Sequence, residues 1–297
     1  MRRYLSGTSI MARATLALGA LLAIGLSAAT AAEPTRIVIA GGDIGEIVAA
    51  LGASDRVVGA DTTTIYPPEL TSLPKVGYAR ALSAEGVLSL APDLLLGAHD
   101  AGPATVLDQI RAAGVPVELA PAGEGAEAVP AKIAFVGKAL GLGPEAAELT
   151  GAYEAEMAEV LGDVAKMTAR PKVLFILTLR DGAPMVGGAG TSADAMIALA
   201  GGENAAQGFE GYKPMNREAV MAAAPDVILM MDGNAERTGG IAAAMALPEI
   251  AATPAGRANR AVTMEGMLLL GFGPRTPEAV RDLALALHPE EAAVVEP

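Results

Sequence analysis

The chain has 297 residues, of which 52% are hydrophobic, and it contains no cysteine and no tryptophan. It carries 34 acidic against 21 basic side chains, a formal net charge of −13. Such a charge disfavours nucleic acid and anionic membranes as partners and favours a cationic patch on another protein. Without disulfides the chain must rely on its core, and its length is enough for one core in each of two domains.

The first 32 residues have the pattern of a secretory signal peptide. The chain starts MRR, an apolar stretch follows from about residue 14 to residue 29, and small residues lead up to Glu33. Because this stretch is shorter than the ~20 residues that span a bilayer, we expect cleavage after Ala31 or Ala32 rather than a membrane anchor. Cleavage would remove three arginines and no acid, and the chain has no cysteine that could carry a lipid. We therefore expect a freely diffusing protein in a bacterial periplasm.

The first half of the remaining chain alternates short apolar runs with helical patterns. The expected strands are Arg36–Ala40, Val57–Ala60, Leu94–Leu96 and Val117–Leu119, and the expected helices are Asp43–Leu51, a helix capped by Ser83, and Leu107–Ala113. Alternation of this kind is typical of parallel sheets with helices on both faces.

A different pattern occupies residues 144–168. Strong helix formers fill this segment, and Tyr153, Met157, Val160 and Val164 recur at spacings of three and four. The pattern predicts one long helix of ~25 residues, about 35 Å in length. A single helix of this kind makes a stiff connection, so we expect the regions on its two sides to flex only slightly.

The second half returns to the strand and helix pattern. The expected strands are Lys172–Leu177, Val227–Met231 and Ala261–Met264, and Thr191 is expected to cap a helix that ends at Gly201. The predicted organisation is a signal peptide (1–32), an N-terminal α/β lobe (33–143), a connecting helix (144–169) and a C-terminal α/β lobe (170–297). The predicted fold class is therefore α/β, with two similar parallel-sheet lobes joined by one long α-helix and a ligand cleft between the lobes.

One segment occurs twice. Residues 82–96 read LSAEGVLSLAPDLLL, and residues 215–229 read MNREAVMAAAPDVIL, at a constant offset of 133 residues. The matching pairs include Glu85/Glu218, Val87/Val220, Pro92/Pro225 and Asp93/Asp226. A repeat with this period indicates a duplicated domain, because solenoid repeats are far shorter. Clefts between two such domains are common sites for small ligands.

These features together resemble the substrate-binding proteins of ATP-driven importers for haem, cobalamin and iron siderophores. The resemblance covers residues 35–288, and the run DTTTIYPPELTSLPKVGYARALSAEGVLSLAPDLLL is similar to the haem-binding branch. It implies a monomeric periplasmic protein, not an enzyme, that captures ferric haem b and delivers it to the membrane subunits of an ABC importer. A cobalamin or ferric-siderophore carrier of the same fold is the alternative.

Tyr66 is the expected iron ligand. It precedes Pro67-Pro68, which favours an extended loop after the second strand, at the strand end that faces a cleft. Phenolate is a hard anionic donor suited to ferric iron, and tyrosine is a known axial ligand of haem. From the residues alone an ordinary loop tyrosine is the simpler interpretation, and the resemblance reverses that order.

A second iron ligand is not evident. Some relatives place a histidine after the first strand of the second lobe, but residues 178–182 here contain none. His99 follows a first-lobe strand and is interpreted as a loop histidine, and His288 as a solvated residue at a helix end. The resemblance thus implies five-coordinate iron held by Tyr66.

Haem propionates require arginine, lysine or backbone N–H donors. The candidates are Arg80, Arg180 and Arg237, and the resemblance suggests that Arg237 donates to the Tyr66 phenolate, since a nearby positive charge favours the anion. Each could equally be a solvated surface arginine. The glycine-rich segment 185–191 could approach the porphyrin face or serve as an ordinary packing turn.

Glu85 and Glu218 occupy equivalent positions early in a helix, where the helix dipole favours a carboxylate. The resemblance implies that these two acids dock onto the two importer subunits. The simpler interpretation is a helix-capping acid in each copy.

Other classes of protein fit less well. A zinc or manganese carrier needs several converging histidines, and the chain has only two. Few aromatic residues and 13 methionines favour a flat apolar macrocycle over cobalamin. The segment IVIAGGDIGEIVAALG lacks the spacing of a nucleotide-binding turn, and no nucleophile elbow is present, so no catalytic activity is expected.

Overall fold

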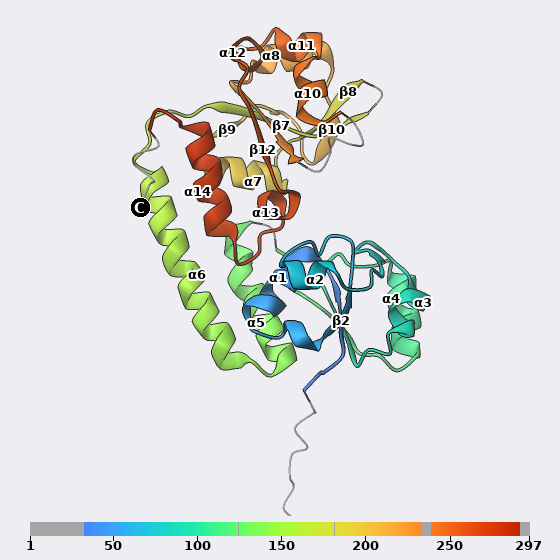
Figure 1. The fold of residues 1–297 in the computed structure, drawn as a ribbon. Helices are drawn as coiled ribbons and strands as arrows, with labels where there is room; N and C mark the ends of the chain where they lie inside the picture. Colours follow the sequence, from blue (N-terminus) through green and yellow to red (C-terminus); the bar gives the residue numbers. More distant parts are fainter. Residues whose placement is uncertain (1–32, 124, 181, 233–238, 292–297) are drawn as a thin grey trace, which may run out of the picture. The chain divides into compact units, whose positions relative to one another are not determined.

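The computed structural model describes residues 33–123, 125–180, 182–232 and 239–291 (Figure 1). Its first sheet is four-stranded, in the order β2-β1-β5-β6, and every pair in it is parallel. The strands are β1 (Ile37–Ala40), β2 (Val57–Ala60), β5 (Leu94–Gly97) and β6 (Val117–Leu119). β1 and β5 are buried along their whole length because helices cover both faces, which explains why these runs are apolar without alternation. The parallel first sheet confirms the prediction.

Helices on the two sides of the first sheet come from different parts of the sequence (Figure 1). The helices of this region are α1 (Gly42–Ala50), η1 (Ser54–Arg56), α2 (Pro68–Thr71), α3 (Ala84–Ser89), α4 (Ala104–Ala112), η2 (Ala126–Ala128) and α5 (Val129–Leu140). A small antiparallel pair, β3 (Gly77–Tyr78) and β4 (Ala81–Leu82), precedes α3. The predicted cap is confirmed, because the Ser83 hydroxyl accepts a hydrogen bond from the backbone N–H of Gly86 at 3.0 Å.

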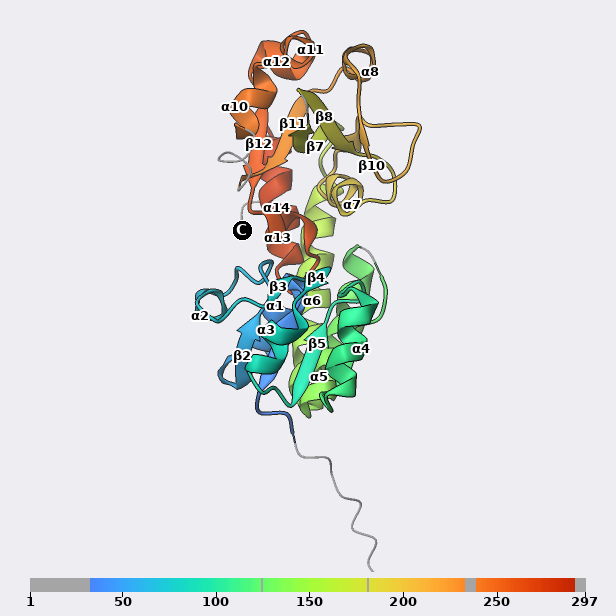
Figure 2. The same ribbon diagram turned by 90° about the vertical axis from the view of Figure 1, so that its right-hand side faces the viewer.

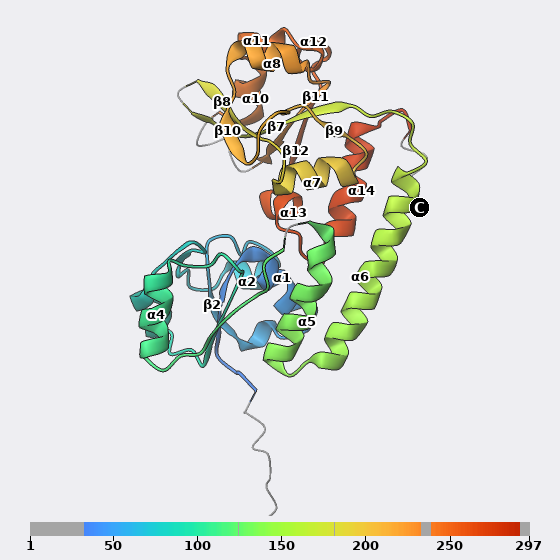
Figure 3. The ribbon, with the colours of Figure 1, turned by 180° about the vertical axis from the view of Figure 1, so that it is seen from behind.

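The long helix is present as α6 (Gly143–Val164), with 22 residues. It ends four residues before the predicted boundary, where hydrogen bonds from Lys166 and Met167 close a tight terminal turn. Figure 3 shows α6 beside α5 and beside α14 (Thr276–Leu287), the last described helix, and both neighbours pack against it. A helix supported on both sides fits the expectation of a stiff connection.

The second sheet has six strands and is mixed rather than purely parallel (Figure 2). Its strands are β7 (Lys172–Arg180), β8 (Ala183–Gly187), β9 (Glu203–Asn204), β10 (Tyr212–Pro214), β11 (Val227–Met231) and β12 (Ala261–Met264). Parallel pairing, as predicted, joins β7 to β11 and β11 to β12, and the short strand β9, which was not predicted, also pairs parallel with β7. β8 and β10 are antiparallel additions at one edge, which the prediction missed. β7 continues three residues beyond its expected end and forms an antiparallel hairpin with β8, and β10 pairs with the other side of β8.

The remaining helices surround the second sheet. They are α7 (Ser192–Leu199), α8 (Arg217–Ala223), α10 (Gly240–Met245), α11 (Pro248–Ala251), α12 (Pro254–Ala258) and α13 (Gly266–Leu270). Thr191 caps α7 as predicted, because its hydroxyl accepts from the N–H of Asp194 at 3.2 Å.

Three clusters of buried apolar residues hold these elements together. One lies between the first sheet and the α3–α4 side, and another lies between the second sheet and the α8–α12 side. The third is continuous, because it joins the inner faces of both sheets through α5, α6, α7 and α14. A shared core of this kind resists relative movement of the two sheets.

The duplicated segment has the same local structure in both copies. Ala91 and Ala224 both adopt a left-handed conformation with φ of 45°, ahead of the proline. The next residue, Asp93 or Asp226, then forms a two-way clamp on the first strand of its own sheet. Asp93 donates its N–H to the carbonyl of Arg36 and accepts from the N–H of Arg36, at 2.9 and 3.0 Å.

Asp226 makes the same exchange with Lys172, at 2.7 and 2.9 Å. The sequence repeat therefore encodes a helix–strand joint, in which the aspartate fixes the start of one strand against its neighbour. This local match supports a duplicated domain independently of sequence identity.

His288 is not solvated, as the sequence pattern suggested. Only 3% of it is exposed, and its Nε2 atom lies 3.2 Å from the carbonyl oxygen of Ala200. The ring is buried because α14 packs against α6 and α7, so the helix end faces the core rather than solvent. That prediction was wrong.

Candidate functional site

The carboxyl ends of β1, β2 and β5 lie at one edge of the first sheet, as in every parallel sheet, and the loops after β1 and β2 are tied to one buried carboxylate. Asp61, directly after β2, has no exposed surface and accepts five hydrogen bonds. The donors are the N–H of Gly41, the N–H and hydroxyl of Thr63, the hydroxyl of Thr64 and the N–H of Ala79, at 2.7–3.1 Å. Asp61 therefore positions three loops of this edge relative to one another.

Tyr66 lies in the loop after β2, outside any helix or strand. The loop is held on both sides of it, since Lys75 donates to the carbonyl of Thr64 and Thr71 donates to the carbonyl of Ile65, each at 2.8 Å. Tyr66 itself is 42% exposed, and Ile65 beside it is similarly exposed. A rigid loop thus presents an accessible phenol at the sheet edge.

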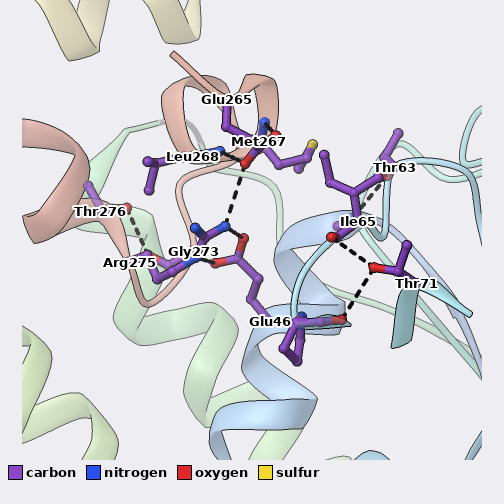
Figure 4. Close-up of polar contacts among 12 residues, drawn as sticks. Glu46, Thr63, Ile65, Thr71, Glu265, Met267, Leu268, Gly273, Arg275 and Thr276 are labelled. Carbon is purple, nitrogen blue, oxygen red and sulfur yellow. Dashed lines mark hydrogen bonds and ion pairs between the residues drawn. The ribbon is translucent and has the colours of Figure 1, made fainter. Parts of the chain in front are cut away.

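Arg275 covers one face of the Tyr66 ring, with its guanidinium carbon 3.7 Å from the ring centroid. Figure 4 shows this arginine between Glu46 of α1 and Glu265, the residue that precedes α13. The Nε atom of Arg275 donates to Glu46 at 3.1 Å, Nη2 forms a second short contact with the same carboxylate, and Glu265 lies 3.6 Å away. This bidentate pair joins the first lobe to the segment after the second sheet.

Burial affects the pKa values of both members of the Glu46–Arg275 pair. It raises the pKa of the Glu46 carboxyl above its ordinary value, and the hydrogen bonds and charge of Arg275 oppose that effect only in part. Burial also acts to lower the pKa of Arg275, but the hydrogen bonds and charge of Glu46 outweigh it, so that the pKa of Arg275 is raised. Arg275 therefore stays cationic over the Tyr66 ring.

Arg80 lies in the turn between β3 and β4, near the end of β5. It pairs with Asp100, and its guanidinium carbon is 5.1 Å from the ring centroid of Tyr78. Burial acts to lower the pKa of Arg80, but the contacts with Asp100 outweigh it and raise the pKa. His99, next to Asp100, is exposed in the loop after β5. Arg80 is thus a partly engaged cation at the same sheet edge as Tyr66.

The other predicted ligand-binding residues are placed less favourably or lie outside the description. Arg180 was expected in a loop, but it is the exposed last residue of β7, opposite Ala183 in the hairpin. Arg237 lies outside the described residues. In the glycine-rich segment 185–191, a Cβ atom at Gly188 would lie 2.5 Å from the Phe209 ring, so this glycine serves ordinary packing.

Glu85 and Glu218 are both exposed and both lie in the first turn of their helices, α3 and α8. The hydroxyl of Ser83 and the side chain of Asn216 supply the helix caps, so neither glutamate is needed for capping. The equivalent acids are therefore available to solvent on the two copies of the repeat.

Sequence reasoning missed Asp61, Glu46 and Arg275. One signal for Arg275 was available, because the motif GFGPRTPEAV puts a cation at the start of a helix, where the dipole disfavours positive charge. Such an arginine needs nearby acids. No local pattern in the sequence of α1 identifies Glu46 as the partner of Arg275, because the two residues are 229 positions apart.

A hollow of about 590 Å³ lies elsewhere, between the end of α6, α7 and the η2 segment, with Glu127, Leu161 and Arg170 in its lining. Tyr66, Arg80 and Arg180 do not line it. Across the ranges that the structure describes, no helix is long and apolar enough to cross a membrane. Within the same ranges, no group of three or more histidine and acidic side chains could hold a metal ion directly.

Several solved structures share this architecture. The chain is 43% identical to the periplasmic heme-binding protein BhuT in complex with two hemes, with a TM-score of 0.81 over 88% of this chain and 99% of that chain. It is also 43% identical to the periplasmic heme-binding protein RhuT from Roseiflexus sp. RS-1, with a TM-score of 0.82 and the same coverage. A periplasmic heme-binding protein from Pseudomonas aeruginosa is 37% identical over 86% of this chain and 93% of that chain, with a TM-score of 0.79.

Curated sequences match this chain as well. An ABC transporter substrate-binding lipoprotein of Bacillus subtilis, YvrC, is 29% identical over 87% of this chain and 81% of its own length. A vitamin B12-binding protein of Yersinia pestis is 30% identical, but over only 33% of this chain and 35% of its own length.

The model of the periplasmic binding protein family matches residues 37–267, which include both sheets and the long helix between them. The two-lobed α/β architecture predicted from the sequence is the one found in these structural relatives. This chain belongs to the periplasmic binding protein family.

Proposed function

We propose that this protein binds ferric haem in a cleft between an N-terminal lobe (33–143) and a C-terminal lobe (170–297), linked by residues 144–169, and delivers it to an inner-membrane ABC importer. The single observation that carries the proposal is the accessible Tyr66 phenol, held at the edge of the first sheet in a chain 43% identical to two periplasmic heme-binding proteins. The protein acts as a carrier and not as an enzyme.

Tyr66 supplies the iron ligand in this proposal. Its loop is fixed by Asp61 and Lys75, so the phenol needs no large rearrangement to meet a ligand. An oxygen donor of this type suits ferric iron, and haem b is the form that we propose as cargo. The iron is five-coordinate, and exposed His99 is the residue to test if Tyr66 is not the ligand.

Arginines near the same edge would bind the haem propionates. Arg80 is the first choice, since its pairing with Asp100 leaves more than half of its side chain exposed. Arg180 and Arg237 remain further candidates on the second lobe. Because charge-assisted hydrogen bonds to carboxylates are about twice as strong as neutral ones, one such arginine is enough to orient the macrocycle.

Glu85 and Glu218 would dock onto the two membrane subunits of the importer. They are exposed, they occupy matching positions in the two copies of the repeat, and they are not needed as helix caps. Duplicate acids suit a partner with two-fold symmetry, and a monomer is enough to present both.

The periplasm is the proposed location, with residues 1–32 as a cleavable signal peptide. The curated relative from Bacillus subtilis is a lipoprotein, whereas this chain has no cysteine to which a lipid could be attached. Mass spectrometry of the protein purified from the periplasm tests both points, since cleavage after Ala31 or Ala32 and the absence of a lipid are both visible in the intact mass.

Cargo selection tests the function. The purified protein is dialysed to equilibrium against hemin, cyanocobalamin and a ferric siderophore in parallel. We expect saturable binding of hemin alone, with a Soret band that shifts from that of free hemin. Saturable binding of cyanocobalamin or the siderophore without hemin would support the alternative cargo, which the short vitamin B12-binding match favours only weakly.

A further inference from the structure

Two buried ion pairs lie where the first lobe meets the segment after the second sheet, and both start from α1. Asp43 pairs with Lys132 of α5 at 2.7 Å, and Lys132 also donates to the carbonyl of Phe272 at 3.2 Å. One helical turn later, Glu46 holds Arg275. α1 therefore presents its apolar face to the core, Asp43 to Lys132 of α5, and Glu46 to Arg275 of the other lobe.

The two sides approach each other closely at glycines. A Cβ atom at Gly42 would lie 2.7 Å from the Cε atom of Met267, and one at Gly273 would lie 2.9 Å from a carboxylate oxygen of Glu46. Between these contacts Phe272 adopts φ of 49°, a left-handed conformation that is costly for a residue with a side chain. The segment 271–275 is thus held in one specific arrangement against α1.

Only one of the two cations also contacts the candidate iron ligand. Lys132 is buried with Asp43, whereas Arg275 lies over the ring of Tyr66 and is 18% exposed along its side chain. Arg275 is also the N-cap residue directly before α14, so its position depends on a helix of the second lobe. A cation at this helix start is disfavoured by the dipole and is held there by Glu46 and Glu265.

We propose that Arg275 is a positioning residue that couples Tyr66 to the contact between the lobes. Resting on the proposed function, the inference is that the Glu46–Arg275–Glu265 network and haem at Tyr66 stabilise one another. The guanidinium fixes the orientation of the phenol ring and places a positive charge over the ring that carries the proposed iron ligand. A ligand at Tyr66 is thereby sensitive to how the second lobe sits on α1.

The test uses hemin titrations of variants that separate this role from general lobe stability. Arg275→Gln removes the cation, Arg275→Lys keeps the charge without the planar stacking, and Glu46→Gln removes the partner that holds the arginine. Since cation–π contacts are worth about 0.5–2 kcal/mol, we expect Arg275→Gln to weaken the hemin Kd roughly 2- to 30-fold and to shift the tyrosinate charge-transfer band. Arg275→Lys should recover part of the affinity.

Glu46→Gln is the sharper variant, because Glu46 is 6% exposed in its side chain and does not itself face a ligand. We expect it to shift the charge-transfer band in the same direction as Arg275→Gln. Asp43→Asn is the matched control, since it breaks the other buried pair of α1 and lowers Tm without contact to Tyr66. Its hemin Kd should stay within about twofold of the parent value.

Two results would overturn the coupling. One is a parental band and affinity in Arg275→Gln, and the other is an equal loss of affinity in Asp43→Asn and Glu46→Gln, which would indicate general loosening of the lobes. Failure of the unmodified protein to bind hemin would instead contradict the proposed function, so the two failures are distinguishable.

Discussion

Each lobe contains the same helix–strand joint, but the two lobes differ in the side chains at the edges of their sheets. In each copy of the repeat an aspartate after a left-handed alanine clamps the first strand of its sheet, and an exposed glutamate lies in the preceding helix. The first lobe adds a buried hub, Asp61, that fixes an accessible tyrosine loop. The second lobe adds an antiparallel hairpin and the arginine that covers that tyrosine.

This difference separates the scaffold from the site. The duplicated residues maintain the sheets and offer the same acidic group twice, which suits a symmetric partner. The residues that we propose to act on a ligand, Tyr66 and Arg275, lie outside the duplicated segment and come from different lobes. A ligand between the lobes would therefore contact two unlike surfaces, and variants of shared and unshared residues should behave differently.

The largest effect is expected from Asp61→Asn. The amide would turn a nitrogen toward some of the five donors that now meet a buried carboxylate, so we expect the free energy of unfolding to fall by about 3 kcal/mol or more. The Tyr66 loop should also lose its position, with loss of hemin binding. Urea unfolding at neutral pH measures the first effect, and a hemin titration measures the second.

Thr63→Val is the graded control for Asp61, because it removes one hydroxyl that donates to Asp61 and accepts from the N–H of Gly42. We expect a loss of about 1 kcal/mol. If Asp61→Asn were no more damaging than this control, Asp61 would not be the hub of the sheet edge.

A second, smaller effect concerns the duplicated acids. Glu85→Lys and Glu218→Lys should each reduce importer-dependent hemin uptake about tenfold, because a reversed charge repels a cationic docking surface by several kcal/mol at most. Hemin Kd and Tm should stay at parental values, since both side chains are exposed. Uptake assays in reconstituted vesicles measure this, and loss of hemin binding in either variant would contradict a docking role.

The smallest expected effect is on the free energy of unfolding, in variants of the two clamping aspartates, Asp93 and Asp226. Burial acts to raise the pKa of Asp93, but hydrogen bonds from Thr35 and Arg36 outweigh it, so the pKa lies below its ordinary value of 3.8. A carboxyl of this kind contributes stability that is present above 3.8 and is lost as the pH falls through its lower, folded-state pKa. Asp93→Asn should therefore cost about 1 kcal/mol at pH 7 and less at pH 3.

Asp226→Asn is the matched control, because Asp226 accepts from the N–H of Lys172 in the same geometry. Urea unfolding at pH 7 and pH 3 compares the two variants. An Asp93→Asn cost that is unchanged at pH 3 would contradict the assigned origin of its stability.

Much of the fold could be predicted because its signals are local. The strands Val57–Ala60, Val117–Leu119, Val227–Met231 and Ala261–Met264 have the predicted bounds, since each is a short apolar run between turn residues. The caps Ser83 and Thr191 were equally readable, because the side chain and its N–H partner are three residues apart. The long helix was evident from its composition.

What escaped prediction depends on contacts between distant segments. The antiparallel edge of the second sheet required knowing that Thr178–Arg180 continues a strand, and the burial of His288 required the docking of α14. The Glu46–Arg275 pair joins residues 229 positions apart, and no single-sequence pattern identifies such a partner. Tyr66 became the candidate ligand through its motif, whereas no motif pointed to the arginine over its ring.

The most direct measurement of the central claim is the absorbance of hemin bound to the Tyr66→Phe variant. Phenylalanine keeps the ring that stacks on Arg275 and removes only the oxygen, and Tyr78→Phe serves as a control at a tyrosine of similar exposure. We predict that the parent and Tyr78→Phe show a tyrosinate charge-transfer band that Tyr66→Phe lacks, with hemin Kd weakened at least ~100-fold in Tyr66→Phe. An unchanged band and Kd in Tyr66→Phe would contradict the account and move the iron ligand elsewhere, with His99 the next residue to test.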